Sequence, residues 1–282
     1  MSRADCTGAT LRGFVNSRCA RPGHDLLQES LGRLDHVRDH GPQRSGRRAQ
    51  GRRSAGSRSL LVDTGAQAAA LEDRGLAGGA ARANTHMGPI TKLVAQEFIN
   101  AGIPEGCIIE RQPYLPGYYR VRKQWDLVVV CDGILVAAIE FKSQVGSVGK
   151  NINNRFEEAL GTATDTHAAQ TKNEAYGQVP PWLGYVFVLQ ETAETEQENR
   201  SVAALFPTDP TFKGMSYNQR YQEMVKRFIG DGVYQAGWFI ATKKTDEGIV
   251  YNEPLVTATA EAFTAQIRGR IDFVNAVLNA KR

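Results

Sequence analysis

Apolar and polar positions alternate with changing periods after residue 86, and these periods predict the secondary structure. Apolar residues three or four positions apart predict a helix from near Gly88 to Gly102, and further helices over 151–170, 216–229 and 258–278. Short runs rich in Val, Ile, Phe and Trp predict strands over 107–111, 182–189 and 236–242. Two more apolar runs flank Asp132-Gly133, a dipeptide typical of tight turns, and predict a β-hairpin over 125–146. The order of elements predicts an α/β domain with a mixed sheet flanked by helices.

Three charged residues lie on this otherwise apolar hairpin. Asp126 stands at the start of its first strand, and Glu140 and Lys142 stand at the end of its second. Charged side chains are rarely buried without a partner or a metal, so these three need a role. Two carboxylates can hold Mg²⁺, and a neighbouring lysine can orient or activate water or neutralise charge on a phosphate. The cluster indicates a nuclease site in which Asp126 and Glu140 bind Mg²⁺ and Lys142 is catalytic.

The turn of the hairpin decides whether these side chains can meet. Glu140 and Lys142 share a face because side chains alternate along a strand. A two-residue Asp-Gly loop would turn Asp126 to the opposite face, whereas a three-residue loop would set it across from Glu140. The nuclease hypothesis therefore requires an odd-numbered loop or a β-bulge. The alternative is that Glu140 and Lys142 form a surface ion pair where the strand leaves the core.

Polar residues around the hairpin are candidates for contacts with nucleic acid. Basic residues before it could bind phosphates or form a solvated loop: Arg120, Arg122 and Lys123. Polar residues after it could read base edges or cap a helix: Ser143, Gln144, Asn153, Asn154 and Arg155. Glu97, on the first predicted helix, is a candidate accessory acid or an ordinary solvated glutamate.

Residues 1–85 differ in composition from residues 86–282. Up to residue 91 the chain has 14 arginines, no lysine and 8 acidic residues, whereas the remainder has 20 basic and 22 acidic residues. So few large apolar side chains cannot offset the entropy of ordering, which predicts a disordered basic extension before an endonuclease domain over 86–282. The extension could bind phosphates as a basic arm, be a transit peptide, have no role, or be translated in a wrong frame.

The cysteines and the apolar runs bear on location. Four scattered cysteines, with no CxxC pair, predict neither a zinc site nor a disulfide scaffold and fit a reducing cytoplasm. No apolar run approaches the roughly 18 residues of a membrane span, and the amino terminus has no continuous apolar signal segment. We expect a cytoplasmic protein with no membrane partner.

Several long strings resemble the XhoI family of type II restriction endonucleases over about residues 86–255. These strings are LPGYYRVRKQWDLVVV, IEFKSQVGS, NINNRFEEALGTATD, PPWLGYVFVL, SYNQRYQEMVKRFI and VYQAGWFIAT. The resemblance implies the PD-(D/E)XK nuclease fold, with Asp126 and Glu140 as metal ligands and Lys142 as the catalytic lysine. Trp125 stands where the proline that names this motif would be.

The same resemblance implies a function and partners. Members of the family would be expected to cut double-stranded DNA within the palindrome CTCGAG with Mg²⁺, beside a methyltransferase that protects the host DNA. A palindromic site implies a two-fold homodimer, because the symmetry of the protein mirrors that of its DNA. Two alternatives are a structure-specific repair or junction nuclease of the same fold, and a non-catalytic DNA-binding protein.

Overall fold

A sheet of six strands forms the centre of the protein in a computed structural model that describes residues 87–111, 113–198, 204–246 and 248–280. The strand order is β1 (Ile108–Ile109), β4 (Leu127–Cys131), β5 (Ile134–Gln144), β6 (Leu183–Glu191), β7 (Ala236–Thr245) and β8 (Gly248–Asn252). β5, β6 and β7 run parallel, and the outer pairs are antiparallel. The predicted disordered extension, residues 1–85, lies outside the described residues.

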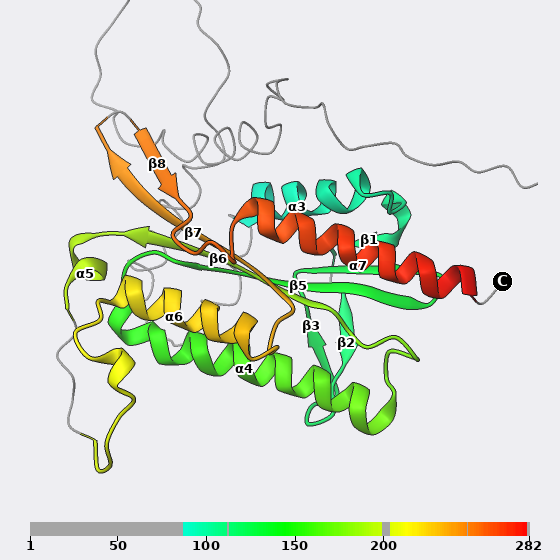
Figure 1. The fold of residues 1–282 in the computed structure, drawn as a ribbon, viewed down its shortest axis with the longest axis horizontal. Helices are drawn as coiled ribbons and strands as arrows, with labels where there is room; N and C mark the ends of the chain where they lie inside the picture. The colour runs from blue at the N-terminus through cyan, green and yellow to red at the C-terminus, as the bar shows by residue number, and fades with distance from the viewer. Residues whose placement is uncertain (1–86, 112, 199–203, 247, 281–282) are drawn as a thin grey trace, which may run out of the picture.

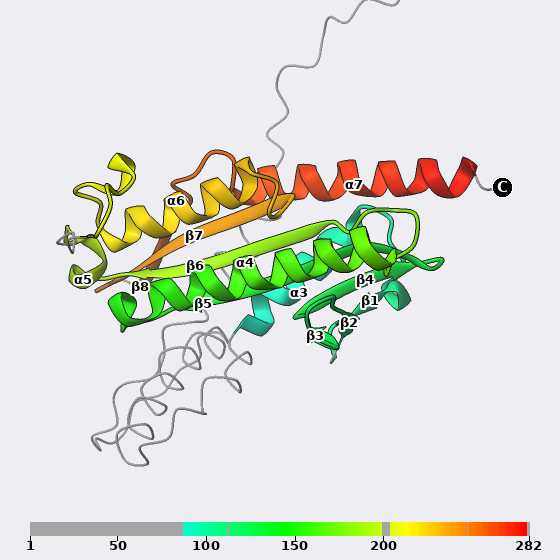
Figure 2. The ribbon, with the colours of Figure 1, turned by 90° about the horizontal axis from the view of Figure 1, so that it is seen from below.

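Helices cover both faces of the sheet (Figures 1 and 2). α3 (Gly88–Asn100) and α7 (Ala260–Ala280) pack on one face, and α4 (Val148–Asn173) and α6 (Tyr217–Gly230) pack on the other. The short elements are η2 (Glu105–Cys107), α5 (Ala193–Glu196) and η3 (Pro210–Phe212). The mixed α/β sheet flanked by helices is therefore confirmed. Within the described part of the chain, no helix has the length and apolar content needed to cross a membrane.

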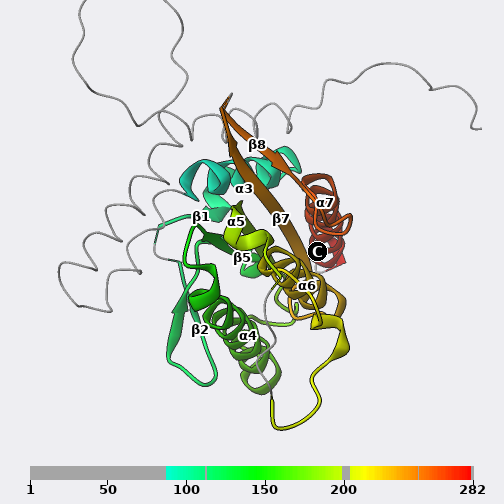
Figure 3. The ribbon, with the colours of Figure 1, turned by 90° about the vertical axis from the view of Figure 1, so that its left-hand side faces the viewer.

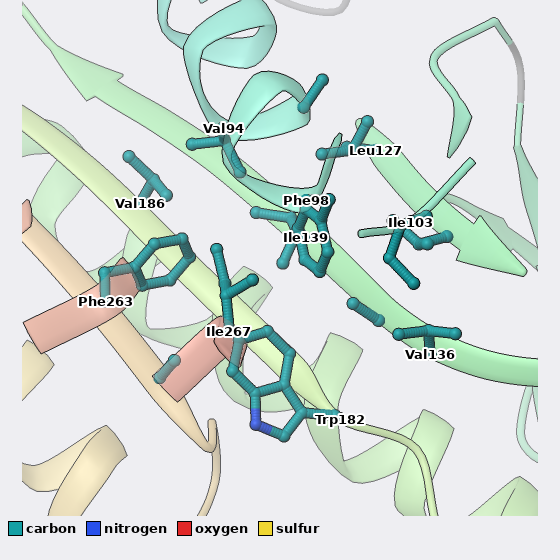
Figure 4. Packing of buried hydrophobic residues seen from close by; sticks show 14 of the residues in the cluster. Val94, Phe98, Ile103, Leu127, Val136, Ile139, Trp182, Val186, Phe263 and Ile267 are labelled. Carbon is teal, nitrogen blue, oxygen red and sulfur yellow. The ribbon is translucent and has the colours of Figure 1, made fainter. Parts of the chain in front are cut away.

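The central strands are almost continuously apolar because both of their faces are covered. On the α3 and α7 side, Phe98 and Ile267 belong to one buried cluster with Ile139 of β5 (Figure 4). On the other side, Phe187 of β6 and Phe239 of β7 stack at a centroid distance of 5.9 Å. Burial on both faces fixes the register of these strands, which positions the polar residues at their ends.

The predicted helices and central strands are present, with shifted ends. α4 begins at Val148 rather than near Asn151, because Gly146 and Ser147 have positive φ angles of 65° and 47° and turn the chain out of β5. The turn-rich and basic segments before the hairpin form a second, two-stranded sheet of β2 (Tyr114–Pro116) and β3 (Arg122–Gln124). These three-residue strands are largely exposed and lack the apolar alternation that predicts a strand.

The scattered cysteines predicted no disulfide scaffold and a reducing cytoplasm, and one pair of cysteines departs from that expectation. Cys107 and Cys131 are disulfide-bonded across 24 residues, with their Cα atoms 5.3 Å apart. Antiparallel pairing of Ile109 with Val128 brings the two segments together. Spacing along the sequence does not reveal this, because the two-residue strand β1 is too short to be paired from its pattern.

Candidate active site

A β-bulge in β5 sets Asp126 across from Glu140. The turn itself has two residues, which alone would put the carboxylates on opposite faces. Farther along, the register shifts by one and Val136 is the inserted residue, so that Leu127 pairs with Ile139. Asp126 and Glu140 come next on the two strands and stand opposite each other. The bulge that the nuclease hypothesis required is confirmed.

Side-chain packing around the bulge agrees with the change of register. Val136 and Ala137 are consecutive residues, yet both belong to the buried cluster on the α3 and α7 side. Leu135 and Ala138, on either side of them, belong to the cluster on the α4 and α6 side. Side chains alternate between the two faces along a strand, so Glu140, two residues after Ala138, also lies on the α4 side of the sheet.

Asp126, Glu140 and Lys142 line one cavity of about 930 Å³. Its walls come from the carboxyl end of β5, from β3 and the turn before it, and from α4. Figure 3 shows α4 beside β2, the strand that pairs with β3. Among the other predicted residues, Arg120, Lys123, Ser143 and Arg155 line the same cavity. Tyr119 and Asp165, which are 46 residues apart, thus line the same cavity.

Glu140 is buried between two lysines. Its side chain is 4% exposed, and its Oε1 and Oε2 atoms lie 2.6 Å from Nζ of Lys142 and 2.9 Å from Nζ of Lys123. Burial alone would raise the pKa of Glu140, but the charges of Lys142 and Lys123 outweigh it and lower that pKa. Glu140 is therefore an ionised carboxylate held by two ammonium groups.

Lys142 keeps its charge in this arrangement. Burial acts to lower the pKa of Lys142, and the adjacent Glu140 carboxylate overcomes this and raises it. A protonated lysine donates hydrogen bonds and neutralises negative charge, but it cannot accept a proton. Of the roles predicted for Lys142, orienting water and neutralising charge on a phosphate fit this state.

Asp126 is held close to a like charge. Its Oδ2 atom accepts a 2.8 Å hydrogen bond from the backbone N–H of Phe141, the residue after Glu140. Burial and then the Glu140 charge raise the pKa of Asp126 to about 6. A divalent cation bound by both carboxylates would relieve this repulsion, so the pair fits a metal site chemically.

The donor set for a metal is small. Among the described residues, no group of three or more His, Cys, Asp or Glu side chains is arranged to hold a metal ion. Mg²⁺ suits a site with few protein ligands, because it binds through one or two carboxylates and retains several waters. Two carboxylates thus suit a hard divalent cation that keeps part of its water shell better than a metal that needs a full protein cage.

The basic residues before the hairpin have different environments. The Nε atom of Arg120 donates to Oδ2 of Asp165 at 2.7 Å. Arg122 is exposed, with its Cζ atom 4.3 Å above the ring of Tyr114. Lys123 faces inward and forms an ion pair with Glu140, a contact that its place in a basic run did not predict.

The polar residues after the hairpin also differ in exposure and in their contacts. Asn153 and Asn154 are exposed in the first turns of α4. Arg155 forms a 2.8 Å ion pair with Glu158. Gln144 is 3% exposed and donates a 2.6 Å hydrogen bond to the Gly146 carbonyl, so its amide supports the chain reversal before α4.

The candidate accessory acid is not brought to the cavity. Glu97 lies on α3 and accepts a 3.5 Å hydrogen bond from Asn100. It is not among the described residues that line the cavity of Asp126. Glu110, from a different segment, lines a smaller cavity that also reaches Asp126 and Phe141.

Asp165 is the site residue that sequence reasoning missed. It is a buried carboxylate in the middle of α4 and accepts hydrogen bonds from the backbone N–H groups of Tyr118 at 2.9 Å and Tyr119 at 2.7 Å. The available signal was an acid on the buried stripe of the helix, between Ala163 and Ala169. Its hydrogen-bond partners could not be predicted, because the sequence pattern of residues 117–121 indicates only a turn-rich segment with no fixed position.

Comparisons with known proteins identify the family of the chain. The profile of the restriction endonuclease XhoI family matches residues 66–252, a match that begins within residues 1–85. The type II restriction enzyme XhoI of Xanthomonas vasicola is 41% identical over 135 residues, which cover 46% of this chain and 54% of that protein. The type II restriction enzyme BstVI of Geobacillus stearothermophilus is 36% identical over 151 residues, which cover 51% of this chain and 67% of that protein.

A third relative is also a type II restriction enzyme. The type II restriction enzyme AbrI of Azospirillum brasilense is 44% identical over 110 residues, which cover 36% of this chain and 49% of that protein. The chain thus spans about half the length of the XhoI and AbrI relatives. No solved structure matches the chain. Because the family profile matches more than half of the sequence, the chain belongs to the XhoI family of restriction endonucleases.

Proposed function

We propose that this protein is a type II restriction endonuclease that hydrolyses phosphodiester bonds of double-stranded DNA at a specific palindrome. The observation that carries the proposal is the β-bulge, because it brings Asp126 and Glu140 together on the face that also carries Lys142. Family membership and the names of the relatives support DNA cleavage as the reaction.

The core of the fold corresponds to a PD-(D/E)XK nuclease in this proposal. A helix, α3, precedes the antiparallel hairpin of β4 and β5, and α4 then leads to the parallel strand β6. The two carboxylates and the lysine lie at the end of that hairpin, where the resemblance assigns the ligands and the catalytic lysine. The endonuclease domain in this assignment runs over residues 86–282.

The residues that line the cavity have different roles in the proposed reaction. Asp126 and Glu140 would hold Mg²⁺, whose chemistry is to polarise the phosphate and to make a bound water more acidic. The backbone N–H of Phe141 orients the Asp126 carboxylate toward the cavity. The ammonium group of Lys142 lies next to Glu140 and can orient the attacking water and offset charge that develops on the phosphate oxygens.

The remaining assignments extend the proposal. The expected target is CTCGAG, which implies a homodimer with matching two-fold symmetry. The enzyme would act in the bacterial cytoplasm as part of a restriction-modification system, with a methyltransferase protecting the same sequence. The exposed or cavity-lining residues Arg122, Ser143, Asn153, Asn154 and Arg155 remain candidate DNA contacts.

The test uses unmethylated plasmids that differ only in one CTCGAG site. With Mg²⁺, the wild type should convert only the plasmid with the site to a linear product, and Glu140→Gln and Lys142→Ala should lower the rate by at least about 100-fold. Glu105→Gln, an exposed acid in η2, is the matched control and should cut like the wild type. Equal cutting of both plasmids would favour a structure-specific nuclease. Salt-dependent binding without any Mg²⁺-dependent cutting would favour a non-catalytic DNA-binding protein.

A further inference from the structure

We infer that residues 117–121, the aromatic turn between β2 and β3, are a preformed element that packs against the sugars and bases of duplex DNA beside the cleaved phosphate. The inference rests on the proposed function, because it takes DNA as the substrate of the adjacent cavity. The turn would add a contact surface of apolar and aromatic side chains to the basic and amide residues that are candidate DNA contacts.

The aromatic turn exposes an unusual set of side chains. Tyr118 is 44% exposed, Tyr119 is 74% exposed and Val121 is 91% exposed. The two tyrosine rings meet edge to face at a centroid distance of 4.9 Å, so they form one surface. Contiguous apolar groups at the tip of a hairpin are unfavourable in water and are typical of a contact surface.

The backbone of the turn is fixed before any ligand binds. Asp165 accepts hydrogen bonds from the N–H groups of Tyr118 and Tyr119 and from Nε of Arg120. A Cβ atom added at Gly117 would lie 2.2 Å from the Asp165 carboxylate, so the turn packs tightly against α4. The hydroxyl of Tyr176 donates to the carbonyl of Pro116 and holds the adjoining strand. A preformed turn loses little conformational entropy on binding, which favours a recognition role.

The position of the turn connects it to the site of cleavage. Tyr119 and Arg120 line the same cavity as Asp126 and Glu140. β3 leads from the turn to Lys123, whose Nζ atom contacts Glu140. Because Tyr119 and Glu140 line one cavity, a duplex bound at this cavity would lie close to the aromatic turn.

The charge next to the turn favours DNA as the partner. Arg122 follows Val121 and is exposed, with its guanidinium stacked over Tyr114. Stacking restricts the guanidinium while leaving its N–H groups available to a phosphate. Arginine and tyrosine side chains are both common contacts to the phosphates and sugars of duplex DNA.

The experiment measures the affinity of the full chain for short fluorescein-labelled duplexes, with and without CTCGAG, in EDTA to prevent cleavage. Tyr119→Ala with Val121→Ser should weaken binding at least about 5-fold without changing the salt dependence, since no charge is removed. Arg122→Gln should lower the salt slope by about 1. Leu205→Ser with Phe206→Ala is the matched control, because these residues are 99% and 81% exposed in the loop before α6.

The outcomes separate this inference from the proposed function. A loss of affinity in the turn variant, with a melting temperature equal to that of the wild type, supports the inference even if the wild type proves unable to cut DNA. Wild-type affinity in the turn variant overturns it, even if CTCGAG plasmids are cut. Equal losses in the turn variant and the Leu205 and Phe206 control also overturn it, because the turn would then have no special role. A wild type that binds neither duplex overturns it as well.

Discussion

The Nε atom of Arg270 on α7 donates a 2.9 Å hydrogen bond to the carbonyl oxygen of Val136, the residue inserted by the bulge. The Nη2 atom of Arg270 also donates to the carbonyls of Leu135 at 3.0 Å and Pro180 at 2.9 Å. A bulge leaves backbone groups without partners in the ladder, and here a buried guanidinium satisfies them. Burial lowers the pKa of Arg270 to about 10, which leaves it charged at neutral pH. Arg270 thereby stabilises the register that sets Asp126 opposite Glu140.

Replacing Arg270 should destabilise the fold. Arg270→Met keeps much of the side-chain volume but leaves buried carbonyl oxygens without donors, which should lower the free energy of unfolding by about 2–4 kcal/mol. Arg268→Met, an exposed residue on the same helix, should change it by less than about 0.5 kcal/mol. Urea titration of both variants makes the comparison. Equal stability of the two would show that the bulge does not depend on Arg270.

The contact between Arg270 and Val136 also explains why the sequence predicted the three site residues but not the exact geometry of the hairpin. Spacing along β5 placed Glu140 and Lys142 on one face and required a bulge or an odd loop for Asp126. It could not choose between them, because Asp-Gly favours a two-residue turn and the donor to the bulge comes from 134 residues farther along. The central strands and helices followed from apolar periods that burial on the sheet enforces.

The strands β2 and β3 and the contacts of Lys123 and Asp165 were not predicted from the sequence, for one physical reason. β2 and β3 are three residues each and mostly exposed, so no apolar alternation marks them. Without that hairpin, Lys123 could not be assigned to Glu140, and Asp165 had no visible partner on the far side of the cavity. Contacts made by short exposed strands depend on tertiary packing rather than on local pattern.

The contribution of Asp165 to stability should depend on pH. Burial would raise the pKa of Asp165, but the hydrogen bonds from Arg120 and from the Tyr119 and Tyr118 backbone lower it below the ordinary value of 3.8. Because the pKa in the folded state is the lower one, the stabilisation is complete above the unfolded-state pKa and is lost as the pH falls through the folded-state pKa. Asp165→Ala should cost about 1–3 kcal/mol at pH 7.

Asp165→Ala also tests the pH dependence of this stabilisation. The difference in unfolding free energy between the wild type and Asp165→Ala should shrink below about pH 4. Asp272→Ala, an exposed position on α7, should show little difference at either pH. A difference for Asp165→Ala that stays constant from pH 7 to pH 3 would contradict the assigned role of the ionised carboxylate.

Lys123 should compete with a metal ion for Glu140. Lys123 and Lys142 both neutralise Glu140, but Lys123 comes from β3 and occupies Oε2, an oxygen that a metal would need. Lys123→Ala should free that oxygen and tighten Mg²⁺ binding several-fold, as measured by isothermal titration calorimetry without DNA, by removing a competing cation. Lys123→Arg is the control, because it retains a competing charge and should bind Mg²⁺ much as the wild type does. Unchanged Mg²⁺ affinity in Lys123→Ala would show that the lysine does not compete.

Neutralising the two carboxylates should move stability in opposite directions in the absence of divalent metal. Burial and then the facing Glu140 charge raise the pKa of Asp126 to about 6. Asp126→Asn should therefore raise the free energy of unfolding at pH 8 by about 1–2 kcal/mol while retaining an acceptor for the Phe141 N–H. Glu140→Gln should lower it by about 2–4 kcal/mol, because the charges of Lys142 and Lys123 would lose their buried partner. Urea titration in EDTA measures both, and both variants should lose cleavage. A shared sign would contradict the electrostatics of the site, since the same geometry predicts repulsion at Asp126 and attraction at Glu140.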